Sequence, residues 1–166
     1  EPDDPKTTGA TLSRWVVANR GDLRGPDGLP IWKPPYSRII AIDMHSGEFL
    51  WETPNGDTPR HIREHPRLAG LNIPPTGQMV HGVTMPTRTL LLTAPGGDPV
   101  LYALDKRTGK RLGTVRLPAP GQYGMMGYLH EGRQYVVVQI ASGTMPGALV
   151  ALRLPAGADT RASMMA

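Results

Sequence analysis

The stretch that decides the fold is residues 36–51, which read Tyr-Ser-Arg-Ile-Ile-Ala-Ile-Asp-Met-His-Ser-Gly-Glu-Phe-Leu-Trp. Residues 38–43 are a short apolar run rich in β-branched side chains, which favours a strand. Asp43 can accept backbone N–H groups in a turn, and Gly47 can take the left-handed conformation that closes a bulged hairpin. Residues 48–53 then predict a return strand that carries Trp51. The stretch therefore predicts a strand, a tight turn and a second strand.

The same unit returns further along the chain. The Ala, Asp and Gly at positions 41, 43 and 47 recur with the same spacing as Ala103, Asp105 and Gly109. A third and weaker copy begins at residues 148–152. Strand-based self-similarity at this spacing indicates a β-propeller or a β-solenoid. The alternative is two unrelated hairpins that share common turn residues.

The composition supports many short strands rather than helices. The 166 residues include 20 Gly and 18 Pro but a single Phe, and the net charge is +4. Basic residues are scattered except at residues 60–67, which predicts a soluble basic surface rather than a nucleic-acid site. Without cysteine the chain forms neither disulfides nor thiolate metal sites.

No stretch reaches the ~18–20 apolar residues of a membrane span. Because the chain starts at Glu1 without a signal-like segment, we expect a processed or truncated piece.

Turn signals divide the chain into segments of an all-β fold. We expect about two and a half four-stranded antiparallel blades of a larger ring, because open sheet edges remain at both ends. A strand at residues 12–18 opens the first group, and the inner strands of the later groups are expected at residues 80–84 and 123–127. The predicted segments are an incomplete blade at 12–53, an insertion at 54–78 with a short helix near 58–66, a full blade at 79–117, an incomplete last blade at 122–154 and a tail at 155–166.

An ordered series of motifs resembles one family. Residues 28–36, Gly-Leu-Pro-Ile-Trp-Lys-Pro-Pro-Tyr, are followed by Ile-Ala-Ile-Asp and Ser-Gly-Glu-Phe-Leu-Trp. Together with residues 55–59, 98–105 and 128–138, they resemble the late blades of pyrroloquinoline quinone (PQQ)-dependent dehydrogenases, above all the membrane-bound glucose dehydrogenase-like quinoproteins. The resemblance covers residues 14–155. It implies an eight-bladed propeller whose blades are tied by an Ala-x-Asp-x-x-x-Gly-x-x-x-Trp docking motif, which the first copy matches in full. In the second copy Gly113 occupies the Trp place.

The resemblance also implies chemistry for the complete protein. In this family PQQ lies on the propeller axis with Ca²⁺ or Mg²⁺, an Asp acts as general base, and a sugar or alcohol is oxidised with electrons passing to a quinone. It implies a periplasmic location, with membrane association through a region outside these residues. The catalytic and metal-binding residues are expected in earlier blades, so the chain alone is expected to be inactive and to need the remaining blades as partners. The cofactor contacts expected here are Tyr36, His81 and Gly82.

Two other interpretations remain. His61, Glu64 and His65 match a zinc-hydrolase pattern, but Pro59 and Pro66 confine any helix between them to less than two turns. We expect a charged surface helix there. The second alternative for the whole chain is a non-catalytic propeller-like binding or scaffold module.

Overall fold

The computed structural model describes residues 23–25 and 27–155. The chain forms two compact units, residues 1–32 and 33–166, and each is considered by itself. In the first unit, the Gly25 N–H donates to the Leu29 carbonyl at 2.7 Å, and Arg24 forms an antiparallel bridge with Pro30. These contacts close a small loop. The strand predicted at residues 12–18 lies outside the described residues.

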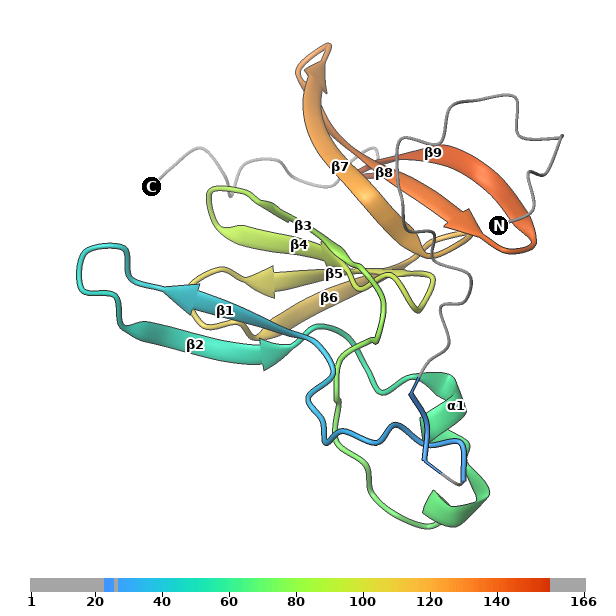
Figure 1. The fold of residues 1–166 in the computed structure, drawn as a ribbon. Helices are drawn as coiled ribbons and strands as arrows, with labels where there is room; N and C mark the ends of the chain where they lie inside the picture. Colours follow the sequence, from blue (N-terminus) through green and yellow to red (C-terminus); the bar gives the residue numbers. More distant parts are fainter. Residues whose placement is uncertain (1–22, 26, 156–166) are drawn as a thin grey trace, which may run out of the picture. The chain divides into compact units, whose positions relative to one another are not determined.

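The described part of the second unit consists of three antiparallel sheets of two, four and three strands (Figure 1). The strands are β1 (Arg38–Ile42) and β2 (Phe49–Pro54), then β3 (Val83–Pro86), β4 (Leu90–Ala94), β5 (Val100–Asp105) and β6 (Arg111–Arg116), then β7 (Gly121–His130), β8 (Arg133–Ser142) and β9 (Met145–Arg153). Each sheet pairs strands in sequence order. The prediction of an all-β, partial propeller is confirmed.

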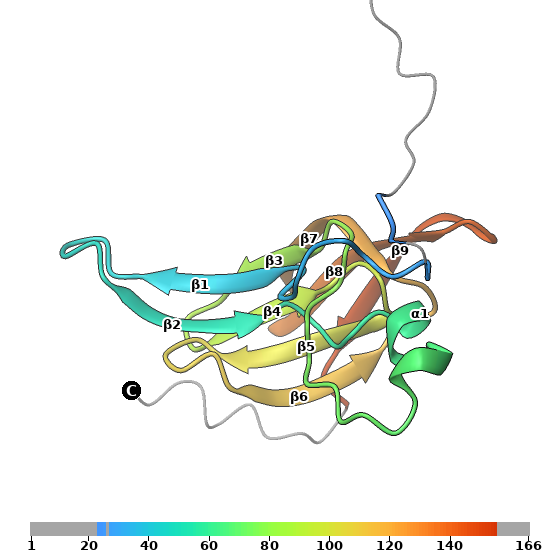
Figure 2. The same cartoon turned by 60° about the horizontal axis from the view of Figure 1, so that its bottom comes forward.

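The alternation of strand directions gives the sheets two distinct ends. The turns at residues 43–48, 87–89 and 106–110 lie at one, which we call the hairpin-turn end. The connections at residues 55–57, 95–99 and 117–120 lie at the other, which we call the connection end. Figure 2 shows the β1–β2 turn and helix α1 (Arg60–Arg63) on opposite sides of this unit.

Two inner strands differ from the prediction in their bounds. The strand expected from residue 80 begins only at Val83, because the preceding segment bonds to the end of the first sheet instead: the Gln78 N–H donates to the Asn55 carbonyl at 3.1 Å. The strand expected at 123–127 lies within the longer β7. Its pairing is irregular between Gly121 and Met125, and Tyr123 there has φ +64°.

The two repeated hairpins close in the same way. The Asp43 carboxylate accepts the backbone N–H groups of His45 and Ser46 at 2.7 and 3.1 Å. The Asp105 carboxylate accepts the two equivalent N–H groups at 2.8 and 3.0 Å. These bonds favour the ionised carboxylate and lower the pKa of both side chains, which we call the turn aspartates. The repeat is therefore a repeat of turn geometry.

Trp51 joins the first sheet to the second. Its indole N–H donates to the Lys106 carbonyl at 3.1 Å. Its ring also covers Gly109, where a Cβ would lie 2.5 Å from Trp51 Cε3. The predicted contact between neighbouring blades through this tryptophan is therefore present. At Gly113, which stands in the Trp place of the second copy, a Cβ would meet nothing within 4 Å, so the equivalent stack is missing.

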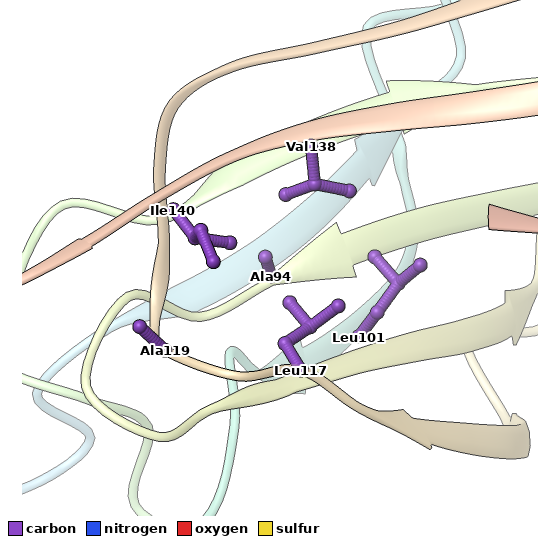
Figure 3. Packing of buried hydrophobic residues seen from close by; sticks show 6 residues of the cluster. All are labelled: Ala94, Leu101, Leu117, Ala119, Val138 and Ile140. Carbon is purple, nitrogen blue, oxygen red and sulfur yellow. The ribbon is translucent and has the colours of Figure 1, made fainter. Parts of the chain in front are cut away.

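The main core lies between the second and third sheets. It consists of Ala94, Leu101, Leu117, Ala119, Val138 and Ile140 (Figure 3). Val138 and Ile140 project from β8 toward the second sheet and are completely buried. Truncating either to Ala would cost on the order of 2–5 kcal/mol. This packing fixes the two sheets against each other.

The insertion after β2 contains the short helical segment that the sequence predicts. Helix α1 is followed by a 3₁₀ turn at Pro66–Leu68, and Ile62 anchors the helix by its burial. The Thr58 hydroxyl donates to the Pro74 carbonyl at 2.9 Å and ties the two ends of the insertion together. No helix in residues 23–25 and 27–155 is both long and apolar enough to cross a membrane.

Candidate functional site

The three residues expected to contact a cofactor all lie at the connection end. Tyr36 comes just before β1, and His81 and Gly82 come just before β3. The Tyr36 N–H donates to the Thr76 carbonyl at 2.7 Å, which fixes this segment on the insertion. Burial raises the pKa of the Tyr36 hydroxyl further above its ordinary value, and the protonated hydroxyl can donate a hydrogen bond.

Gly82 stands where two segments approach closely. A Cβ there would lie 2.7 Å from the Ala94 carbonyl oxygen and 2.8 Å from Asn55 Nδ2. Any side chain would force these groups apart, so the position requires glycine. The Gly82 backbone nevertheless has an exposed side, and His81 is exposed as well. Both residues can therefore meet a ligand without rearrangement of the core.

Asn55 is the residue that links the candidate positions, and sequence reasoning did not select it. It is 9% exposed, and its side-chain oxygen accepts the Thr93 hydroxyl at 2.9 Å. Its N–H donates to the Ser37 carbonyl at 3.0 Å, next to Tyr36. Since its amide nitrogen also abuts Gly82, Asn55 joins the start of β1 to the start of β3. The only sequence signal for it was its place in the family-like motif at residues 55–59.

A second polar network fastens the insertion to the second sheet. The Asp57 carboxylate accepts the Tyr102 hydroxyl at 3.2 Å and the Arg111 guanidinium at 3.0 Å. The guanidinium also lies over the Tyr102 ring, 3.8 Å from its centroid. Burial, reinforced by the nearby Asp57 carboxylate, raises the pKa of Tyr102 to about 12. Gln78 extends this network by donating to Asp98 Oδ2 at 2.8 Å.

The Asp57, Tyr102 and Arg111 network does not by itself form a binding site for PQQ. PQQ carries several carboxylates, which call for cationic partners. The described guanidinium of this network, that of Arg111, is already paired with Asp57. Residues 23–25 and 27–155 contain no group of three or more His, Asp or Glu side chains placed to hold a metal ion. The connection end offers a hydroxyl donor at Tyr36 and an exposed glycine backbone at Gly82.

The zinc-hydrolase pattern does not form a site. Helix α1 has only 4 residues, and Glu64 forms an ion pair with Arg60 at 2.8 Å. His65 lies beyond the helix, where its Nδ1 accepts the Arg67 N–H at 3.2 Å. The histidine pattern therefore serves the local fold, as the flanking prolines predict.

Comparison with known proteins places these observations in a family. Residues 3–136 match the model of the PQQ-dependent glucose, ethanol and alcohol dehydrogenase β-propeller domain. A probable quinate dehydrogenase (quinone) of Xanthomonas campestris pv. juglandis is 36% identical over 129 residues, covering 74% of this chain and 16% of that protein. The quinoprotein glucose dehydrogenase of Escherichia coli (strain K12) is 32% identical over 135 residues, covering 78% of this chain and 17% of that protein.

Another relative is named for a third substrate, glycerol. The glycerol dehydrogenase large subunit of Gluconobacter oxydans (strain 621H) is 33% identical over 116 residues, covering 67% of this chain and 15% of that protein. The chain thus spans about a sixth of the length of the curated relatives it matches. These matches agree with the antiparallel sheets and with the tryptophan docking contact. The chain belongs to the β-propeller family of PQQ-dependent dehydrogenases.

Proposed function

We propose that this chain supplies late blades of a quinoprotein dehydrogenase. The complete protein oxidises a sugar or another alcohol with PQQ and a divalent metal ion, and passes the electrons to a quinone. The observation that carries the proposal is the family match over residues 3–136, with the docking motif assembled as Trp51 on Gly109. The relatives are named for glucose, quinate and glycerol, so a small polyhydroxylated substrate is the class we infer.

The chain's own residues would form part of the wall of the cofactor site. Tyr36 would donate a hydrogen bond from its protonated hydroxyl, and the open backbone at His81 and Gly82 would let a planar group approach. Asn55 would hold these two segments at a fixed separation through its hydrogen bond to the Ser37 carbonyl and the close approach of its side chain to Gly82. PQQ supplies the two-electron redox chemistry when bound. The residues that hold its metal and remove the substrate proton are expected outside the described residues.

An exposed apolar face on the third sheet supports packing against a further blade. One face of β8 carries Val138 and Ile140, which are buried against the second sheet. The opposite face includes Met126 on β7 and Leu149 on β9, which are 56% and 74% exposed. A propeller blade buries both faces against its neighbours, so this face fits a following blade.

We infer that the isolated chain has no activity, and that the complete protein acts in the periplasm with membrane association through another region.

Reconstitution tests the proposal. The complete protein is prepared without cofactor, incubated with PQQ and Ca²⁺, and assayed for reduction of an artificial dye with glucose, quinate and glycerol. We expect dye reduction that needs both PQQ and one of these alcohols. Saturable PQQ binding without dye reduction for any alcohol would instead support a scaffold module that retains the fold.

A further inference from the structure

The Asn55 side chain has a hydrogen-bonded oxygen and an unpaired nitrogen. Its oxygen accepts the Thr93 hydroxyl at 2.9 Å, and both residues are buried, with 9% and 1% of their surface exposed. Among the residues that the structure describes, none accepts a hydrogen bond from the Asn55 amide nitrogen. Every fully buried side-chain nitrogen or oxygen in this part of the chain has a partner, so this nitrogen is not sealed from the exterior. Because an unpaired donor in a buried side chain costs stability, its N–H groups call for an acceptor from outside these residues.

Two neighbours orient the amide with its nitrogen toward Gly82. On one side the Thr93 hydroxyl donates to the oxygen. On the other side the nitrogen and the Ala94 carbonyl oxygen surround the same point, since a Cβ on Gly82 would lie 2.8 Å from the first and 2.7 Å from the second. A reversed amide would place two carbonyl oxygens against each other there, so the nitrogen belongs on this side. Gly82 is exposed, and the unpaired N–H groups therefore lie beside an open backbone of the connection end.

The surroundings of this donor favour a ligand with acceptor oxygens. The two carboxylates of the neighbouring connections already serve the fold, because Asp57 accepts the Tyr102 hydroxyl and Asp98 accepts the Gln78 amide. A carboxylate or carbonyl oxygen of a ligand accepts from the Asn55 amide without needing an acceptor in return. A carboxylate forms the stronger of these two hydrogen bonds, since it carries charge.

We propose that Asn55 donates a hydrogen bond to a carboxylate or carbonyl oxygen of the ligand bound at the connection end. Thr93 is the positioning residue that holds the amide in its donating orientation. This inference rests on the proposed dehydrogenase function. Two ligands of the complete protein can supply such an oxygen, namely PQQ, which carries several carboxylates, and an acidic substrate such as quinate.

Asn55→Asp tests the donor with the smallest change of shape. The aspartate keeps an oxygen for the Thr93 hydroxyl, but a second oxygen takes the place of the nitrogen. In the complete, cofactor-free protein with Ca²⁺, equilibrium dialysis should show the Kd for PQQ raised about ten- to a hundredfold. The matched control is Asn72→Asp, which makes the same change at an exposed asparagine of the insertion. It should leave the Kd within about twofold of the unsubstituted value.

A pair of substitutions at Thr93 separates positioning from packing. Thr93→Val removes the hydroxyl at nearly constant volume and should raise the same Kd about three- to tenfold. Thr93→Ser keeps the hydroxyl and loses the methyl group, and it should recover most of the affinity. If packing alone mattered, the serine variant would bind PQQ more weakly than the valine variant. Urea unfolding shows whether each variant is folded, and this pair decides the matter if Asn55→Asp does not fold.

The KM values of dye reduction distinguish the two sources of the oxygen. With the Kd for PQQ unchanged in Asn55→Asp, a rise in the KM for quinate alone would assign the oxygen to the substrate carboxylate. Any other pattern of KM values at unchanged Kd in the folded variant would overturn the inference and leave the dehydrogenase proposal intact. Absence of PQQ binding by the unsubstituted complete protein would overturn both.

Discussion

The docking of Trp51 on Gly109 can be measured with a pair of matched glycine substitutions. Gly47 and Gly109 hold the same place in the two hairpins, with φ of +75° and +71°. A Cβ at Gly47 meets nothing within 4 Å, whereas one at Gly109 lies 2.5 Å from the Trp51 ring. Replacing either by Ala introduces the same left-handed strain. Only Gly109→Ala also displaces the tryptophan.

The magnitudes follow from this difference. The left-handed conformation costs a residue with a Cβ about 1–2 kcal/mol, which should be the whole effect of Gly47→Ala. Displacing Trp51 loses its hydrogen bond to the Lys106 carbonyl, which is worth about 1 kcal/mol. It also loses the packing of the ring on Gly109, which is worth about 1 kcal/mol as well. Gly109→Ala should therefore lower the free energy of unfolding by about 2 kcal/mol more than Gly47→Ala does.

Urea unfolding of the chain, followed by far-ultraviolet circular dichroism, measures both values. With a slope of about 2 kcal/mol per molar urea, the two midpoints should differ by about 1 M. In a Trp51→Ala background the extra cost of Gly109→Ala should vanish, as a double-mutant cycle requires of a direct contact. Equal midpoints for Gly47→Ala and Gly109→Ala in the unsubstituted chain would refute the docking contact.

Three further predictions concern the connection end and the turns. Gly82→Ala should destabilise the fold by more than about 1 kcal/mol in urea unfolding, because its Cβ would press on the Ala94 carbonyl, while Gly113→Ala should have little effect. The pKa of Tyr102 is raised from its ordinary value of 10.0 to about 12 in the folded protein, so the stability that its protonated hydroxyl contributes should be lost as pH rises from 10 to 12. Asp57→Asn should lower the Tyr102 pKa in a spectrophotometric titration. The turn aspartates have folded pKa values below the ordinary 3.8, so the stability they contribute should be lost as pH falls below this value. Replacing both by Asn should flatten acid unfolding curves in that range, and an unchanged curve would contradict their role.

The features that could be predicted from the sequence are those set by neighbours along the chain. The β1–β2 hairpin follows from an apolar run, an Asp that accepts two N–H groups and a left-handed Gly within a few residues of each other. The docking role of Trp51 came from the family resemblance, and its partner lies 55 residues away. The three sheets could be grouped because turn residues separate their strands.

The features that could not be predicted depend on contacts across the fold. Asp57 meets Tyr102 and Arg111 over separations of 45 and 54 residues, and nothing local marks these three as partners. The start of β3 is displaced to Val83 because Gln78 pairs with Asn55, which is a tertiary contact. The contact between β3 and β7 likewise joins strands that are far apart in the sequence. Pattern and spacing carry no information on such contacts.

Dye reduction by the complete protein and by residues 1–166 under the same conditions is the most direct test of the central claim. Both are incubated with PQQ and Ca²⁺ and supplied with glucose, quinate or glycerol. We expect the complete protein to reduce the dye with at least one of these alcohols, and residues 1–166 to show none. Turnover by residues 1–166 alone, or its absence from the complete protein with every alcohol, would contradict the account.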